Sequence, residues 1–431
     1  MSRILIKGGR ILDPSENIDR QADLLVEDGR IAALGPDLKV SGAEVIDAEG
    51  CWVTPGFVDM HVHLREPGQE YKEDLASGGK AAVAGGFTGV ACMANTDPVN
   101  DDPSVTDYIR SQARKDSPAR VYPIAAATRG LAGEVMTEMS ALRDAGAVAF
   151  SDDGKTIMDA GVMRRVLEYS KLVGLPIIVH AEDCSLVNRG VVNEGPVSTR
   201  LGLPGNPTAA EDLQVARDLM LAKLTGARLH VAHVSSAGAV ALIRRARDEG
   251  VDVTAEVTPH HLSLTDEATS GYDTNTKMAP PLRGAVDVEA CRAALADGTI
   301  DVIATDHAPH AVHEKEVDFV EAPCGILGLE TAFPVVAELV REGRLSPLEL
   351  IRRLSTGAVQ ILDIPGGNLA EGSEADITIV DPERRWIYDA AKGYSKSRNS
   401  PWDGQEMLGR VVATLVAGRL IYHCDRGVLV P

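Results

Sequence analysis

The chain has 431 residues, 44% of them hydrophobic, so its length fits two or three domains or one large barrel with additions. With 63 acidic and 43 basic residues the net charge is −20 and no basic cluster is visible, which argues against nucleic acid and anionic membranes as partners. The six cysteines form no CxxC pair and no apolar run approaches about 18 residues, so a soluble, cytoplasmic protein is expected.

Short strands separated by turns are expected at both ends of the chain. The segment LLVEDGRIAAL predicts a hairpin that turns at Asp28-Gly29, and a second turn is expected at Ala417-Gly418. The candidate strands are Ile4–Lys7, Gly9–Leu12, Asp23–Glu27, Arg30–Gly35 and Ala43–Asp47 near the start, and Ala375–Val380 and Val411–Tyr422 near the end. We therefore predict one small β-sandwich domain, built from residues 1–54 together with residues 367–431.

The middle of the chain, residues 55–366, alternates strand and helix patterns. The strand candidates are Gly56–His63, Gly89–Asn95, Val121–Thr128, Ala147–Asp153, Pro176–Glu182, Arg228–Ser236, Val251–His260 and Asp301–His310. The clearest helical patterns between them are Glu73–Ala84, Met158–Val173, Ala209–Leu224 and Gly238–Asp248. An eight-fold alternation predicts an α/β fold with a closed (β/α)8 barrel of the TIM type, and an open doubly wound sheet is the alternative.

The first barrel strand ends in a pattern that suits a metal site. His61 and His63 are two residues apart, so on a strand both imidazoles point to the same face. Two neutral imidazoles that converge on one point suit a divalent cation, zinc above all. Arg65 has the same parity, so a guanidinium that can clamp a carboxylate is expected beside the metal.

Further histidines and aspartates follow four other strands of the expected barrel. They are Asp152 and Asp153 after the fourth, His180 after the fifth, His233 in the sixth, and Asp306, His307 and His310 after the eighth. In such barrels the chemistry lies at the carboxyl ends of the strands. The set exceeds one closed four-ligand site, so two ions sharing a bridging carboxylate are predicted, with one metal and spare histidines as the alternative.

At these motifs the chain resembles the class I dihydroorotases of the amidohydrolase superfamily. The resemblance covers nearly the whole chain, and HLREPG together with TDHAPH is its most specific part. It is carried by DMHVHLREPG at 59–68, GGFTGVACMANTDP at 85–98, FSDDG at 150–154, VHAED at 179–183, HVAHVSS at 230–236, ATDHAPHAVHEK at 304–315 and APCGILGLE at 322–330.

The resemblance implies a metal-dependent cyclic amidohydrolase with two zinc ions per chain. The ligands would be His61, His63 and Asp306 for one zinc, His180 and His233 for the other, and Asp153 together with a hydroxide as the bridge. The implied reaction is the reversible cyclisation of N-carbamoyl-L-aspartate to (S)-dihydroorotate in de novo pyrimidine (UMP) biosynthesis. The bridging hydroxide would be the nucleophile, and Asp306 would be the general acid and base.

The resemblance also implies which residues bind the substrate. They are His63, Arg65, Asn95, Ala279, His310, Cys324 and Gly325. Ala279 departs from the family, which has asparagine in the corresponding stretch KMAPPLR, so a raised KM is expected. Relatives that bridge their metals with a carboxylated lysine, the hydantoinases and dihydropyrimidinases, differ at the position of Asp153, although Lys155 has the parity to face inward.

Two other functions remain as alternatives. One is a different cyclic amidohydrolase, such as a hydantoinase or an allantoinase, against which Arg65 and Asp153 argue. The other is an inactive relative that acts as a scaffold for an aspartate carbamoyltransferase, against which the full set of metal ligands argues. A homodimer and a complex with that transferase are both compatible with the sequence. We expect Asp59 to be a partner of the metal ligands or structural, and His230 to be a packed or hydrogen-bonded histidine on the opposite strand face. Asp152 is expected to be a partner of the ligands or a turn residue, and His307 a rim or loop residue.

Overall fold

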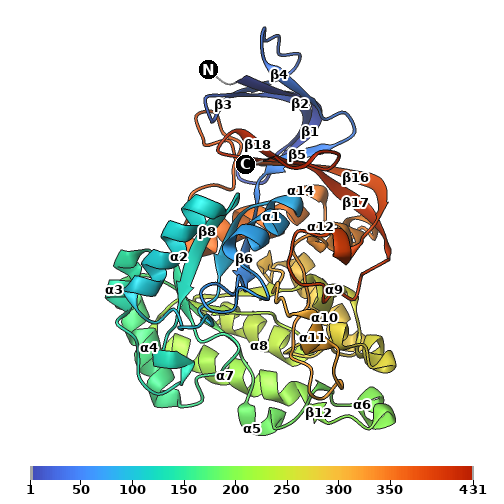
Figure 1. The fold of residues 1–431 in the computed structure, drawn as a ribbon. Coiled ribbons are helices and arrows are strands. Elements are labelled where there is room, and N and C mark those ends of the chain that lie inside the picture. The colour runs from blue at the N-terminus through green and yellow to red at the C-terminus, as the bar shows by residue number, and fades with distance from the viewer. Residues whose placement is uncertain (1–2, 430–431) are drawn as a thin grey trace.

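The computed structural model describes residues 3–429. Figure 1 shows a barrel of strands surrounded by helices, and above it a sheet in which the blue N-terminal strands lie beside the red C-terminal strands. Among the described residues, no helix is both long enough and apolar enough to cross a lipid bilayer.

Eight parallel strands form the barrel, and their order in the sheet follows the order of the chain. They are β6 (Phe57–Val62), β7 (Phe87–Cys92), β8 (Arg120–Ala125), β9 (Ala149–Ser151), β10 (Ile177–Val179), β13 (Leu229–Val231), β14 (Val253–Val257) and β15 (Val302–Ile303). A parallel bridge between Val62 and His307 brings the first strand to the residues that follow the last, and His63 N donates to His307 O at 2.9 Å. The predicted barrel is therefore confirmed, and the doubly wound alternative fails because the strand order never reverses.

Helices cover the outside of the barrel. The longer ones are α1 (Leu75–Ala84), α2 (Pro103–Asp116), α3 (Met139–Ala145), α4 (Ala160–Val173), α7 (Thr208–Thr225), α8 (Ala237–Asp248) and α10 (Ala285–Asp297). The shorter ones are α5 (Cys184–Val187), α6 (Pro196–Leu201), α9 (Pro259–Ser263), α11 (Val312–Lys315), α12 (Ala332–Val336), α13 (Glu338–Arg341), α14 (Pro347–Ile351) and α15 (Gly357–Leu362). Capping residues set the ends of these helices. In α4, for example, the N-cap Asp159 accepts from Val162 N at 2.8 Å, and Gly174 ends the helix with φ +80°.

Short single-turn elements and one two-stranded ladder complete the fold; all but η5, which lies between β16 and β17, belong to the barrel part of the chain. They are η1 (Arg129–Leu131), η2 (Asp266–Gly271), η3 (Thr274–Thr276), the π-helical η4 (Arg352–Thr356), η5 (Ala390–Lys392), β11 (Val192–Asn193) and β12 (Gly205–Asn206). Inside the barrel, small and medium apolar side chains such as Met60, Ala91, Ile124 and Ile178 pack in one cluster.

Both ends of the chain contribute to a single nine-stranded sheet. Its strands are β1 (Arg3–Asp13), β2 (Ile18–Glu27), β3 (Arg30–Gly35), β4 (Glu44–Asp47), β5 (Trp52–Pro55), β16 (Ile377–Ile387), β17 (Glu406–Val416), β18 (Arg419–His423) and β19 (Gly427–Val428). Strands far apart in this sheet share one apolar core, for example through Leu24 of β2 and Leu415 of β17, so the sheet folds over like a sandwich. The predicted joining of the two ends is confirmed.

Local differences from the sequence predictions have simple causes. The two strands expected before residue 13 are one strand, whose register shifts between Ile6 and Gly9. The turn at Asp28-Gly29 has φ +47° and +84°, as a tight hairpin requires. The barrel strands end earlier than predicted, and His260 belongs to α9, because the residues after each strand leave the sheet to form the barrel's rim.

Candidate metal centre

Five strands bring the six predicted metal ligands to one place at the carboxyl end of the barrel. A first group joins His61 and His63, at the end of β6, to Asp306 after β15, and their ligand atoms lie within 4.8 Å of one another. His63 Nε2 lies 3.0 Å from Asp306 Oδ1, and His61 Nε2 lies 3.5 Å from the same oxygen. The ligand set expected for one ion is therefore assembled.

A second group shares His61 with the first and adds residues from the other side of the barrel. The ligand atoms of His61, Asp153 and His233 lie within 4.8 Å of one another. Asp153 Oδ1 is 3.4 Å from His61 Nε2, 3.5 Å from His233 Nε2 and 3.7 Å from His180 Nδ1. Asp153 thus stands between the two groups, as a bridging carboxylate would.

The donor atoms fit a cation. His61 Nε2 and Asp153 Oδ1 are buried and have no hydrogen-bond partner among the residues described, although each faces other ligand atoms. His180 Nδ1 and His233 Nε2 lie 2.9 Å apart. Imidazole nitrogens and carboxylate oxygens that converge in this way are the ligands that zinc takes in proteins. Buried polar atoms without partners are costly, and a bound cation would satisfy them.

The backbone at two ligands is also unusual. Asp306 has φ +48° and His233 has φ +34°, and non-glycine residues rarely adopt such left-handed conformations. Arg65 shares this property, with φ +63°. Strained residues of this kind collect at functional sites, where the surrounding structure holds them in place.

The electrostatics of the centre favour ionised aspartates. Burial opposes the charge on Asp306, but His61 and His63 outweigh it and bring the pKa of Asp306 down to about 2. Burial likewise opposes the charge on Asp153, and His61 and His233 lower its pKa well below the ordinary value. Both carboxylates are therefore negatively charged at neutral pH and able to bind a cation.

Two buried glutamates orient the metal-facing histidines, and the sequence interpretation missed this role. Glu256 in β14 is fully buried, and its Oε1 lies 2.6 Å from His61 Nδ1. Its Oε2 is 3.1 Å from His230 Nε2, which confirms His230 as a packed, hydrogen-bonded histidine. Glu182 Oε2 is 3.0 Å from His180 Nε2. The sequence did contain a sign of this role, because Glu256 is the one acidic residue in the otherwise mainly apolar strand β14.

Replacement of Glu256 by glutamine is expected to weaken metal binding about 10- to 100-fold, because the histidine loses the carboxylate that fixes its ring. Metal titration with a competing chelator would measure it. Glu66→Gln is the matched control, since this buried carboxylate accepts from Leu75 N and Tyr108 Oη instead of a ligand histidine. Equal metal affinities for the two variants would contradict the orienting role.

A cavity of about 500 Å³ lies over the metal ligands. Its lining includes most of the predicted substrate residues, namely His63, Arg65, Asn95, Ala279, His310 and Cys324. Arg65 is 8% exposed and donates to Pro309 O at 3.2 Å. Among residues 3–429, no carboxylate lies within ion-pair distance (4.0 Å) of its guanidinium. A buried cation without an acidic partner, at the wall of a cavity, is suited to an anionic ligand.

The other predicted substrate residues take different positions. Asn95 Oδ1 lies 2.9 Å from His63 Nδ1, so its amide also orients a metal ligand. His310 Nε2 donates to Cys324 O at 2.9 Å, and burial together with Arg65 lowers the pKa of His310 to about 3, which keeps it neutral. Gly325 does not line the cavity. Its N–H donates to Lys277 O at 2.9 Å, and a Cβ there would lie 2.5 Å from Ala308 O.

The remaining residues singled out in the sequence have structural positions. Asp59 is buried and accepts from His61 N and Thr305 N, both at 3.1 Å, and burial raises its pKa to about 7. The Asp152 carboxylate accepts from Thr128 N of a neighbouring loop at 2.9 Å, and its backbone carbonyl accepts from Lys155 N at 2.9 Å in a turn. Lys155 is exposed at the mouth of the cavity. His307 lies after β15 at the rim, as expected, but it is buried there and accepts from Gly328 N at 3.2 Å.

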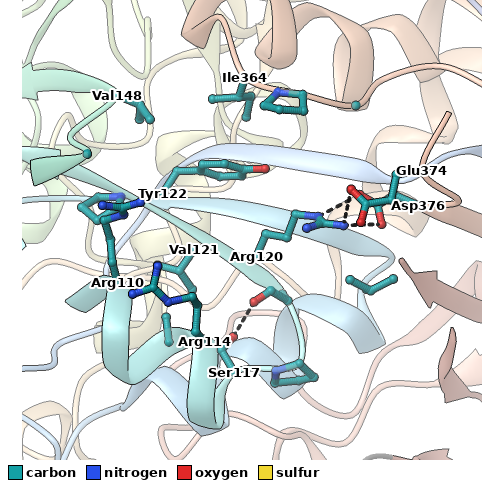
Figure 2. Close-up of a pocket in the computed structure, with 18 of the residues that line it drawn as sticks. Arg110, Arg114, Ser117, Arg120, Val121, Tyr122, Val148, Ile364, Glu374 and Asp376 are labelled. Atoms are coloured by element: carbon teal, nitrogen blue, oxygen red, sulfur yellow. Dashed lines mark hydrogen bonds and ion pairs between the residues drawn. The ribbon is translucent and has the colours of Figure 1, made fainter. Parts of the chain in front are cut away.

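A larger cavity, of about 850 Å³, lies at the opposite end of the barrel, beside the terminal sheet (Figure 2). Arg120, the first residue of β8, pairs there with Asp376 at 2.9 Å and with Glu374 at 3.0 Å. Arg110 donates to Ala145 O at 2.6 Å, at the end of α3. No histidine is among the described residues that line it. Arg110 and Arg120 serve contacts within the protein, and the metal ligands lie at the smaller cavity, which is therefore the candidate active site.

Comparison with known proteins identifies the family of the chain. Residues 50–239 match the family model described as "Dihydro-orotase-like". The chain is 53% identical to a dihydroorotase of Pelobacter propionicus, over 97% of this chain and 99% of that protein, and 51% identical to one of Anaeromyxobacter dehalogenans, over 99% of each. Among solved structures, the L-hydantoinase (dihydropyrimidinase) of Arthrobacter aurescens superposes with a TM-score of 0.89 at 28% identity, over 100% of this chain and 98% of that one.

The two kinds of relative differ in what they share with the chain. The hydantoinase has the same overall fold at 28% identity, whereas the dihydroorotases share more than half of the residues over the full length. This similarity to the dihydroorotases over the full length places the chain in the dihydroorotase family of cyclic amidohydrolases.

Proposed function

We propose that the chain catalyses the reversible cyclisation of N-carbamoyl-L-aspartate to (S)-dihydroorotate. The observation that carries this proposal is Arg65, a buried guanidinium without an acidic partner at the wall of the cavity that contains the metal ligands. Both ends of the reaction carry a carboxylate, and a guanidinium binds a carboxylate through two parallel hydrogen bonds. The place of the reaction would be de novo pyrimidine synthesis in the cytoplasm.

The metal ligands would hold two zinc ions. His61, His63 and Asp306 would bind one, and His180 and His233 the other, with Asp153 shared between them. Bound zinc would lower the pKa of water and polarise a carbonyl group. Because Glu256 and Glu182 accept from the outer nitrogens of His61 and His180, these rings keep their lone pairs turned toward the centre.

The residues of the chain would then orient the ring and move one proton. Arg65 would hold the substrate carboxylate, with His310 and the amide of Asn95 as further contacts, and Cys324 would border the ring at the cavity wall. Asp306 would carry the proton between the attacking oxygen and the ring nitrogen. A general base must stay within about 3 Å of the attacking oxygen and of the ring nitrogen. The position of Asp306 at the rim is fixed, with its Oδ1 3.0 Å from His63 Nε2.

The proposed domain organisation follows the sequence prediction. Residues 55–366 would form the catalytic barrel, and residues 1–54 and 367–431 would form the second domain. A homodimer and a complex with an aspartate carbamoyltransferase are the proposed assemblies to test by sizing columns and light scattering with the purified chain and the mixture.

Parallel assays with dihydroorotate, hydantoin and allantoin would test the reaction. The expected result is hydrolysis of dihydroorotate far above the other two, and cyclisation of N-carbamoyl-L-aspartate in the reverse direction. Arg65→Lys serves as the specificity control, because lysine keeps the charge but loses the two-pronged geometry. Preferential hydrolysis of hydantoin or allantoin would contradict the proposal and favour the rival amidohydrolase. Absence of all three activities from a metal-loaded sample would favour the scaffold.

Ala279→Asn is expected to lower the KM for dihydroorotate, with little change in kcat. Ala279 lines the cavity, and an asparagine there could add one hydrogen bond to the bound ring, of about 0.5–1.5 kcal/mol. A contact made equally in the bound and transition states changes KM alone. Steady-state kinetics would check this, with Ala279→Val as the control that adds volume without a hydrogen bond. Unchanged KM and kcat would refute the explanation.

A further inference from the structure

Residues 395–400, here called the strap, belong to the connection between β16 and β17, yet they contact the rim of the barrel. Ser397 Oγ donates to Lys72 O at 2.7 Å, and Lys396 Nζ donates to Glu70 O at 2.7 Å. Lys396 also forms an ion pair with Asp74. These contacts join the strap to the loop after β6, which carries Arg65.

One side chain of the strap connects two further loops of the candidate active site. Asn399 is 3% exposed, and its Nδ2 donates to Ala308 O and to Gly325 O, both at 2.9 Å. Its Oδ1 accepts from His310 N at 3.0 Å. Two carbonyls require the NH₂ group and one N–H requires the oxygen, so the surroundings fix the orientation of the amide. Among natural side chains of this length, only asparagine supplies this set.

The backbone of the strap and a buried carboxylate reinforce the same connection. Asn399 O accepts from Leu327 N at 2.9 Å, which attaches the loop that follows Gly325. Glu73 is fully buried; it bonds to Ser395 Oγ and accepts from Lys396 N at 3.3 Å, and its Oε2 is 3.4 Å from His307 Nε2. The strap therefore contacts all three loops that carry Arg65, His310 and Cys324.

We propose that the strap is a positioning element for substrate binding, and that Asn399 sets the positions of His310 and of the Cys324–Gly325 loop against the bound ring. The inference rests on the proposed function, since it concerns the same cavity. Asn399 is a positioning residue, because it contacts these residues through their backbones and does not line the cavity. The C-terminal part of the chain, outside the barrel, thereby determines the geometry of a site built on barrel strands.

Asn399→Ser tests the proposal, because serine keeps one hydroxyl but cannot make the three bonds. The expected result is a KM for dihydroorotate raised about tenfold or more, with kcat within about threefold of wild type and unchanged zinc content, since a small misplacement of binding groups is costly while the metal ligands stay in place. Asn368→Ser is the matched control. Asn368 Nδ2 donates to Gly366 O at 3.2 Å in a loop that does not reach the cavity, so its KM should not change.

Two outcomes would overturn the proposal: an unchanged KM in Asn399→Ser, whether or not kcat falls, or loss of bound zinc. If Asn399→Ser does not fold, Lys396→Met decides, because this residue is partly exposed and its replacement removes only the bonds to Glu70 and Asp74. A KM raised about threefold would support the strap, and a wild-type KM would overturn it. Wild type assayed in parallel distinguishes the two proposals. An active wild type with an unchanged KM in the variant overturns the strap proposal alone, whereas a wild type inactive toward dihydroorotate overturns the proposed function.

Discussion

Asp306→Asn is expected to lower kcat for dihydroorotate hydrolysis by roughly three orders of magnitude, within the 10²- to 10⁴-fold that a positioned acid or base contributes. In the structure Asp306 Oδ1 lies 3.0 Å from His63 Nε2. Asparagine keeps an oxygen of the same size at this position, so metal binding can persist while proton transfer is lost. Rapid-mixing or steady-state kinetics at saturating substrate would measure the change, together with metal analysis of the same sample.

The control for this substitution is Asp152→Asn. Asp152 is a buried aspartate next to a proposed ligand, but it accepts from Thr128 N at 2.9 Å and is not among the converging ligand atoms. Its variant should keep kcat within about tenfold of wild type. Turnover by Asp306→Asn at the wild-type rate, with metal bound, would exclude the acid and base role. If Asp306→Asn also loses metal, the fall in kcat reflects lost metal binding. Its kcat should then be measured after zinc has been added back and shown to be bound.

Removal of metal by a chelator is expected to abolish activity and to lower the melting temperature, because His61 Nε2 and Asp153 Oδ1 would again be buried without partners. Zinc added back should restore both properties, with the activity reaching its maximum at two equivalents per chain. Asp153 lies between both ligand groups, so filling of the two positions should be linked. Calorimetric titration and a thermal melt at each step would record this.

Variants of single histidines would show which position is filled. His180→Asn should bind one zinc less than wild type, because His180 is a proposed ligand of the second zinc only. His313→Asn is the control; it lies exposed on the rim beside Tyr71 and should retain the full zinc content. Maximal activity at one equivalent of zinc, with His180→Asn unaffected, would favour the single-metal alternative.

The repeated strands and helices could be predicted from the sequence because each is a local pattern. The metal ligands could be predicted for a related reason: His61, His180 and His233 each follow or end an apolar strand, and the barrel brings those ends together. Arg65 was expected at the cavity from its parity with the histidines, but it lies beyond the end of β6 with φ +63°. Its place is set by the rim, through Pro309 O.

Contacts between distant segments could not be predicted in this way. Glu256 and His61 are 195 positions apart, and Asn399 and Ala308 are 91 apart. The sequence around each of these residues gives no indication of its distant partner. The burial of His307 was missed for the same reason, since it depends on Glu73, 234 positions earlier in the chain. The identities of the proposed ligands thus follow from local sequence, whereas the orientation of their side chains follows from the closed barrel.

The sheet shared by the two ends of the chain has a consequence for synthesis on the ribosome. β5 pairs with β16, and Val53 aligns with Ile379. During synthesis β5 therefore cannot form this pair until more than 300 further residues have been made. At about 5–20 residues per second, that wait lasts tens of seconds, during which the edge of β5 and its apolar face are open. The nascent chain must therefore pass through a stage in which its N-terminal strands lack a complete sheet, and this interval is when chaperones would be most needed.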